Sequence, residues 1–219
     1  TADGKFEPLK QKNVDTGMGL ERTLCMINGL KSAYETDLFA DAIAQISEVS
    51  GKKYGEDEAT TRAIRIIADH IRTATFMIGD ERGVVPSNVD QGYILRRLIR
   101  RSVRFARQIG YDPARLIDLA RIYISKYEHV YPELRMNADK IVDELAKEEE
   151  KFSKTLENGL KEIEKVLRYV QGDTLNGKTA FRLYDTYGFP IEMTQEICRE
   201  KGFGVDMDGY AKAFEEHQK

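Results

Sequence analysis

The stretch "GYILRRLIRRSVRFARQIG", residues 92–110, carries six arginines in a chain whose formal net charge is −3. At roughly 100° per residue, a helical wheel of this stretch separates into two faces. One face gathers the residues Leu95, Leu98, Ile99, Ser102, Phe105, Ala106 and Ile109. The opposite face gathers Arg96, Arg97, Arg100, Arg101, Arg104 and Arg107. The pattern predicts a helix that packs its apolar side on a core.

A strip of guanidinium groups repels itself unless an anion lies against it. Phosphate backbones are one such partner, because guanidinium forks match phosphate oxygens. Internal carboxylates are another, either in the acidic segment 139–150 or as ion pairs at the core. Periodicity leaves both readings open. We expect no DNA partner, since the preceding "PSNVDQGY" does not provide the short turn of a helix-turn-helix.

Helical patterns extend outward from this stretch in both directions. Apolar spacing and end signals predict helices at 19–29, 36–51, 56–79, 112–131, about 132–170, and 180–202, the last split at Gly188 and Pro190. Residues 5–18 indicate a strand or two broken by Pro8, and 172–179 indicate a turn. We therefore predict a mainly α fold of about six or seven helices, preceded by a short strand–helix segment.

Composition bounds the environment of the chain. Its 219 residues are 41% hydrophobic, and no apolar run approaches the ~18 residues that a membrane span needs. Cys25 and Cys198 lie too far apart in sequence for a disulfide framework, which favours a reducing cytoplasm. The three histidines are dispersed, so we expect no metal site. Because the sequence has no long apolar run, we also expect no membrane partner. The chain begins with Thr1, which is consistent with either a fragment or a processed chain.

A glycine turn precedes the first predicted helix. In "VDTGMGLER", residues 14–22, Gly17 and Gly19 flank Met18, and Arg22 falls in the first helical turn. Glycines let a backbone approach a ligand closely, and an arginine nearby can hold phosphate. Arginine is unfavourable at a helix N-terminus unless it has a partner, which favours a binding role for Arg22.

Three segments together resemble the alanyl-tRNA synthetases, a family of class II aminoacyl-tRNA synthetases. "DTGMGLER" is similar to the third class II motif. "ADHIRTATFMIGDERGVVPSNVDQGYILRRLIRRSVR" and "FRLYDTYGFPIEMTQEICRE" resemble two parts of the tRNA-recognition region of the family. Their order and separation also agree, so the resemblance covers nearly the whole chain.

The resemblance implies a domain division and an activity. Residues 1–36 would be the end of the class II catalytic domain, and residues 37–219 the helical tRNA-recognition domain. The family attaches alanine to its tRNA through alanyl-adenylate, using ATP and Mg²⁺. Its Zn²⁺ belongs to an editing domain that this sequence does not resemble. The first and second class II motifs are also missing, so we expect no bound cofactor and no activation of alanine by this chain alone.

The resemblance also implies roles for single residues. Arg22 would bind the γ-phosphate of ATP, Gly17 and Gly19 would line the adenosine side, and Asp15 would orient the turn. Asn88 and Asp185 would select a G·U wobble pair in the acceptor stem. The arginines Arg96, Arg97, Arg100, Arg101 and Arg104 would contact the tRNA backbone.

Base reading by these two residues is chemically reasonable. A wobble pair leaves the guanine 2-amino group unpaired in the minor groove, which is wide and shallow in RNA. A carboxylate or amide oxygen can accept a hydrogen bond from that group. The residues alone leave simpler readings open: Asn88 as a helix N-cap and Asp185 as a solvated turn residue.

Two function classes other than a ligase remain open from the residues. One is a free-standing RNA-binding helical module, which would bind tRNA without ATP. The other is a structural helical domain whose arginines are paired internally, which would show no salt-sensitive RNA binding. The glycine turn at residues 17–19 argues against both, because neither requires it.

Overall fold

The computed structural model describes the chain except for residues 1–3, 5–7, 9, 12, 14–15 and 219. The chain divides into two compact units, residues 1–40 and 41–219. The first unit contains α1 (Leu20–Ile27) and a 3-10 turn, η1 (Ala33–Glu35). The helix predicted to end at Gly29 is confirmed as α1. Half of the residues 5–18, where a strand was predicted, lie outside the described residues. The catalytic identity of residues 1–36 stays a prediction.

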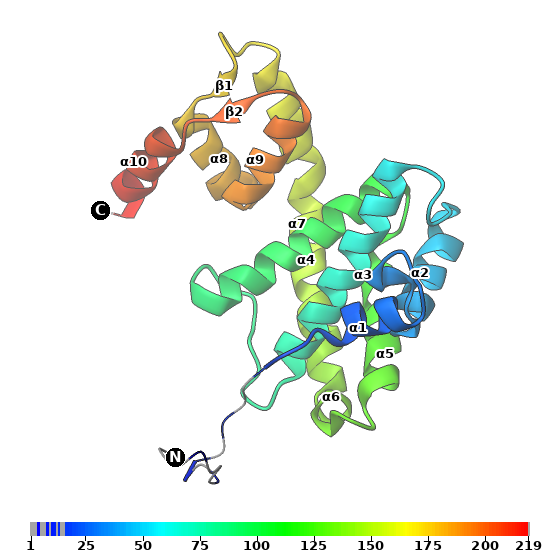
Figure 1. Ribbon diagram of the computed structural model, residues 1–219. Coiled ribbons are helices and arrows are strands. Elements are labelled where there is room, and N and C mark those ends of the chain that lie inside the picture. Colours follow the sequence, from blue (N-terminus) through cyan, green and yellow to red (C-terminus); the bar gives the residue numbers. More distant parts are fainter. Residues whose placement is uncertain (1–3, 5–7, 9, 12, 14–15, 219) are drawn as a thin grey trace. The chain divides into compact units, whose positions relative to one another are not determined.

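The rest of the chain is helical, as predicted. After α2 (Asp37–Ser50) come α3 (Glu58–Gly79), α4 (Asp90–Ile109), η2 (Pro113–Arg115), α5 (Leu116–Tyr127), α6 (Pro132–Met136), α7 (Ala138–Leu167), β1 (Thr174–Leu175), α8 (Gly177–Tyr187), α9 (Ile191–Glu200), β2 (Gly204–Val205) and α10 (Met207–Gln218) (Figure 1). The mainly α fold class is confirmed. Within the described residues, nine α-helices follow residue 36, more than the six or seven expected.

Two local predictions are wrong. The helix expected at 132–170 is broken at Asn137, which lies between α6 and α7. The side-chain amide of Asn137 donates to the carbonyl of Gly79 at 2.9 Å at this break. The turn expected at 172–179 contains β1, which pairs in parallel with β2 through Thr174 with Gly204 and Leu175 with Val205. The two strands lie about thirty residues apart in sequence, so local sequence patterns do not indicate their pairing.

A four-helix core of α3, α4, α5 and α7 organises the second unit. Helix α3 begins at the Asp57 side chain, which accepts from the Thr60 amide at 2.7 Å, and it packs most extensively on α4. The fully buried side chains that fill this core include Ile64, Ile67, Ile71, Leu95, Ile99, Leu119 and Ile141. Tyr123 of α5 is also buried, and its hydroxyl donates to the Ala68 carbonyl at 2.9 Å. The apolar face predicted for the arginine-rich helix therefore lies in this core.

Helix α7 continues from the core to the C-terminal helices (Figure 1). Its Gly159 leaves space for Phe189, because a Cβ at residue 159 would lie 2.5 Å from the Phe189 ring. Phe189 is buried between α8 and α9, with its ring centroid 5.7 Å from that of Phe152 on α7. The turn between α8 and α9 is thus attached to α7. Among the helices described, none has the length and apolar character needed to cross a membrane.

Substitution of Gly188 tests this attachment. Gly188 ends α8 with φ +70°, and a Cβ there would lie 2.6 Å from Nη1 of Arg100. Gly202 has a similar φ of +82° with no atom near its Cβ position. A residue with a Cβ in this backbone region costs about 1–2 kcal/mol. We expect Gly202→Ala to lower the free energy of unfolding by about that amount, and Gly188→Ala by at least ~1 kcal/mol more, because Arg100 must move. Urea unfolding of both variants measures the difference; equal losses would contradict it.

Candidate nucleic-acid interface

The arginine face of α4 lies against carboxylates from α7 and α9. The sequence pattern left two partners open for the strip of guanidinium groups, an external phosphate or internal carboxylates. For five of the arginines the structure has internal pairing. The ion pairs are Arg96–Glu148 (3.2 Å), Arg100–Glu148 (2.6 Å), Arg97–Glu192 (2.8 Å), Arg101–Glu196 (2.6 Å), Arg104–Glu196 (3.2 Å) and Arg104–Glu200. Arg107, at the end of the helix, is exposed. Most of this face is therefore an interface within the protein.

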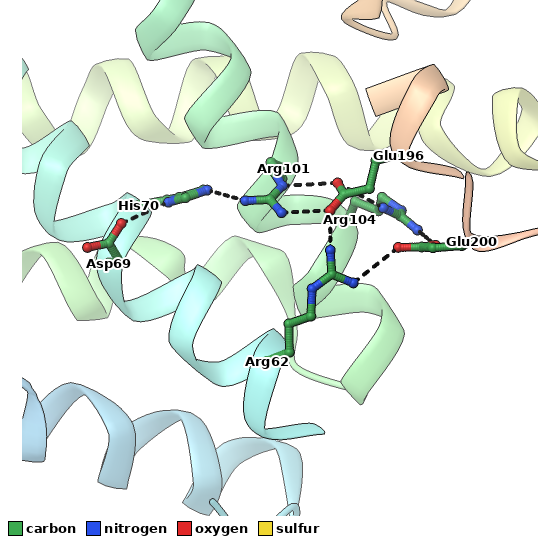
Figure 2. Close-up of polar contacts among 7 residues, drawn as sticks. All are labelled: Arg62, Asp69, His70, Arg101, Arg104, Glu196 and Glu200. Carbon is green, nitrogen blue, oxygen red and sulfur yellow. Dashed lines mark hydrogen bonds and ion pairs between the residues drawn. The ribbon is translucent and has the colours of Figure 1, made fainter. Parts of the chain in front are cut away.

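Glu196 of α9 is the centre of one cluster (Figure 2). Its two oxygens accept from Arg101 at 2.6 and 3.0 Å and from Arg104 at 3.2 Å, and α3 adds Arg62 at 2.7 Å. Arg62 and Arg104 also meet Glu200, one turn further along α9. These contacts attach α9 to both α3 and α4.

A histidine extends the same cluster toward the core. Nη1 of Arg101 lies 2.8 Å from Nε2 of His70, and Nδ1 of His70 lies 3.2 Å from the Asp69 carboxylate (Figure 2). Burial raises the pKa of Glu196, but the hydrogen bonds and charges of its arginine partners lower it more, so the pKa lies below its usual value. The hydrogen bond with His70 likewise lowers the pKa of Asp69 against the effect of burial.

Glu148 of α7 is the centre of a second, more buried cluster. Its side chain is 6% exposed and that of Arg100 is 8% exposed. Arg100 donates from Nε to Glu148 at 2.6 Å, and from Nη1 to the carbonyl of Gly188. Burial lowers the pKa of the Arg100 guanidinium, and Glu148 opposes that shift. Arg96 forms an ion pair with the same carboxylate oxygen and donates to the side-chain oxygen of Asn88.

Asn88 and Asp185, which lie far apart in sequence, line one pocket of about 250 Å³. The structure thus brings together the two residues expected to read a base pair. The other residues of this pocket are Tyr93, Arg96, Arg100, Lys151, Tyr184, Gly188 and Pro190. Cations and aromatic rings therefore surround one carboxylate and one amide.

The structure removes the simpler reading of Asn88 and leaves open that of Asp185 as a solvated residue beside a turn. Val89, not Asn88, is the N-cap of α4, and the cap has no side-chain hydrogen bond, so the N-cap alternative for Asn88 is wrong. Asp90, the first residue of α4, has a left-handed backbone with φ +49°. Asp185 lies in the last turn of α8 with about half of its side chain exposed, 3.6 Å from Nε2 of His217.

The predicted nucleotide-binding turn lies in the first unit. Gly17, Gly19 and Arg22 are exposed, and Gly19 is the N-cap of α1. A Cβ on Gly19 would lie 3.5 Å from Nε of Arg22, so the arginine folds back over the helix N-terminus. Asp15, expected to orient the turn, lies outside the described residues. The three predicted residues that are described share one exposed surface at the start of α1.

The cysteines and potential metal ligands give no further site. Cys25 on α1 donates to the Leu30 carbonyl, and burial raises the pKa of Cys198 on α9 to about 11. Both are free thiols in helices. Within the part of the chain that is described, no group of three or more histidine, cysteine or carboxylate side chains is arranged to hold a metal ion.

The sequence analysis missed the carboxylate partners on α9, whereas Glu148 lies in the acidic segment 139–150 that it named as a possible partner. Glu192, Glu196 and Glu200 recur every four residues, which places them on one face of α9. That acidic stripe complements the arginine stripe of α4 and was a readable signal. Glu148 has no comparable pattern, because it lies within a run of three glutamates of which only one is buried.

Comparison with known proteins identifies the family. The protein-family model for "tRNA synthetases class II (A)" matches residues 1–219. The chain belongs to this family. It is 48% identical over 220 residues to the alanine–tRNA ligase of Treponema pallidum, and 48% identical over 217 residues to that of Borreliella afzelii. Each match covers 99% of this chain and 36% of the relative. The chain therefore spans about a third of the length of these relatives.

Comparison with a relative from Dehalococcoides mccartyi gives a consistent result. Its alanine–tRNA ligase is 45% identical over 212 residues, which are 97% of this chain and 24% of the relative. The resemblance drawn from the three sequence segments is confirmed at the level of the family. The matches do not test the roles of single residues, which remain predictions.

The pH dependence of stability tests the Glu196 cluster. Because the pKa of Glu196 is lower in the folded protein, its contribution to stability is present above the usual value of 4.5 and is lost as the pH falls through the folded value. We expect Glu196→Gln to lower the free energy of unfolding by about 1.5–3 kcal/mol at pH 7, because a charged hydrogen-bond acceptor is removed. Below pH 4.5 the variant should lose stability less steeply than the wild type.

Urea unfolding at a series of pH values measures both effects. Glu81→Gln, which changes an exposed carboxylate on the loop after α3, is the matched control and should keep the slope of the wild type. Parallel pH profiles for Glu196→Gln and the wild type would contradict the assignment.

Proposed function

We propose that the complete protein is an alanine–tRNA ligase, which joins alanine to its tRNA at the expense of ATP, and that this chain reads the acceptor stem. The family match and the printed names of its relatives support the reaction. The observation that carries the proposed reading role is the pocket shared by Asn88 and Asp185, which we call the reading pocket. The proposed site of action is the cytoplasm.

The reading pocket offers one donor and one acceptor to a base pair. The side-chain oxygen of Asn88 accepts from Arg96, so its amide NH₂ is oriented to donate. The Asp185 carboxylate accepts. In a G·U pair the guanine 2-amino group has no partner and lies in the minor groove, where Asp185 would accept from it. In a G·C pair the same amino group already donates to cytosine, so the contact is weaker.

The positive charge of the arginine face suits a phosphate backbone despite the internal pairing. Arg62 of α3 and the five paired arginines of α4 contact only four glutamates, so the cluster keeps an excess of positive charge in a chain of net charge −3. Among the five paired arginines of α4, Arg97 and Arg101 have the most exposed side chains, at 35% and 27%. They line a second pocket of about 560 Å³, together with Arg62 and Arg199.

This difference in exposure ranks the predicted backbone contacts. We assign direct phosphate contact to Arg97 and Arg101. Arg96, Arg100 and Arg104 are more deeply buried, and we assign them attraction of the backbone at longer range. Phosphate contacts of this kind position the RNA, while the reading pocket specifies the base pair.

The glycine turn supplies the proposed ATP contact. Arg22 would hold the γ-phosphate, and Gly17 and Gly19 would let the adenosine approach the backbone. Residues 1–36 would then be the end of the catalytic domain and residues 37–219 the tRNA-recognition domain. Mg²⁺ would enter with ATP in this proposal, and Zn²⁺ would belong to a part of the enzyme outside this chain.

Binding of acceptor-stem hairpins tests the reading role. We expect the wild-type chain to bind a hairpin with G·U more tightly than the same hairpin with G·C, by about tenfold. Asp185→Ala and Asn88→Ala should each reduce that ratio, because each removes one contact to the base pair. The slope of log Kd against log salt should not change, since the phosphate contacts remain.

Asp143→Ala is the control for these variants, because Asp143 is an exposed carboxylate on α7 that does not line the reading pocket. It should keep the ratio of the wild type. Equal, salt-dependent binding of both hairpins by the wild-type chain would contradict the reading role and would favour a module that only holds the RNA backbone.

Pyrophosphate exchange tests the ATP contact. In a longer chain that includes the complete catalytic domain, Arg22→Ala should raise the KM for ATP about tenfold or more, since a charge-assisted contact to phosphate is lost. The KM for alanine should change little, and Lys31→Ala, which removes another exposed cation of the first unit, should behave as the wild type. The present 219-residue chain should give no exchange. Unchanged ATP dependence of Arg22→Ala would contradict the assignment.

A further inference from the structure

Glu148 is joined to both walls of the reading pocket without lining it. One carboxylate oxygen of Glu148 lies 3.2 Å from Nε of Arg96 and 2.6 Å from Nε of Arg100. Arg96 donates onward to Asn88, and Arg100 donates onward to the carbonyl of Gly188. Gly188 ends the helix that carries Asp185. Two short chains of contacts therefore lead from one carboxylate to the proposed donor and the proposed acceptor.

We propose that Glu148 is the positioning residue that sets Asn88 and Asp185 at the separation needed to read the wobble pair. This inference rests on the proposed function of the reading pocket. Glu148 does not itself touch the RNA. Its carboxylate holds two guanidinium groups side by side, and each guanidinium fixes one wall of the pocket.

The Asn88 wall depends on this support because it lacks regular secondary structure. Residues 80–89 connect α3 to α4 as a loop, and Asn88 is exposed. Arg96 reaches this loop at two points, since it also donates to the Pro86 carbonyl at 3.4 Å. With Arg96 held by Glu148, the oxygen of Asn88 is occupied and its NH₂ group points away from Arg96. Release of Arg96 would let the amide rotate and would lose the donor.

The Asp185 wall depends on α7 through two carbonyls at the end of α8. Thr155 of α7 donates directly to the Tyr187 carbonyl at 2.8 Å. The Gly188 carbonyl is reached only through Arg100, whose guanidinium lies between Glu148 and the Phe152 ring, 5.2 Å from the ring centroid. Without Glu148, two like charges would remain in a mostly buried site, and they would separate. The end of α8 would then lose the contact between the Gly188 carbonyl and Arg100.

Glu148→Gln tests the inference, because glutamine keeps the shape of glutamate and removes its charge. In the hairpin assay we expect the G·U to G·C binding ratio to fall about tenfold, as expected for loss of an oriented contact to a base. The salt slope should stay that of the wild type, because Glu148 makes no phosphate contact.

Two controls separate positioning from lost stability. Glu150→Gln changes an exposed glutamate of the same helix, which pairs with Lys154, and should leave the ratio unchanged. Gly202→Ala should lower stability and also leave the ratio unchanged, because residue 202 does not line the pocket. In a double variant that combines Glu148→Gln with Asn88→Ala, the G·U to G·C binding ratio should fall by less than the product of the two single reductions. Both changes act on the same contact.

Arg96→Lys carries the test if Glu148→Gln does not fold. Lysine keeps the charge beside Glu148 but lacks the fork that reaches Asn88, so the ratio should fall to that of Asn88→Ala. If the wild type discriminates and these variants discriminate equally well, the inference is overturned and the proposed function stands. If the wild type binds both hairpins equally, the proposed function fails and this inference fails with it.

Discussion

The fold beyond its apolar core depends on the pairing of buried guanidinium groups with carboxylates. Arg100 and Arg104 are each only 8% exposed, and an arginine does not lose its proton on burial to escape the penalty. Each must therefore meet an anion, and the anions come from α7 and α9. Because α4 and α7 are already fixed in the core by residues such as Leu95 and Ile141, this requirement determines where α9 docks.

That docking also determines where the candidate site lies. Glu196 and Glu200 attach α9 to α3 and α4, and Glu148 draws Arg100 toward the end of α8. The turn at Gly188 and Phe189 can approach α7 because residue 159 is glycine, and it can approach Arg100 of α4 because residue 188 is glycine. The same contacts that close the C-terminal helices onto the core thus place Asp185 in one pocket with Asn88.

The sequence could predict what depends on local patterns, and it failed where distant residues decide. Helix α4 and the division of α8 from α9 follow from periodicity and from Gly188 and Pro190. The break at Asn137 depends on a hydrogen bond to Gly79, and β1 depends on a partner strand about thirty residues away, so neither has a local signal.

The candidate site shows the same limit. A helical wheel finds the arginine face but cannot say which anion meets it, and the answer for five arginines is a glutamate of this chain. Resemblance to a family selected Asn88 and Asp185 together, which spacing could not have done. It did not select Glu148, because the link runs through Arg96 and Arg100 and exists only after folding.

The contact of α4 with α7 and α9, which we call the ionic seam, consists largely of ion pairs, and stability alone does not explain this choice. Replacement of a buried ion pair by well-packed apolar residues is often neutral or stabilising, so a hydrophobic seam would hold these helices at least as well. An apolar side chain, however, has no directed contact with which to orient the Asn88 amide or to hold the Gly188 carbonyl. Nor would it leave the excess of positive charge that remains when more arginines than glutamates gather around α4. One arrangement of ion pairs therefore both attaches the C-terminal helices and orients the residues of the site that we propose binds RNA.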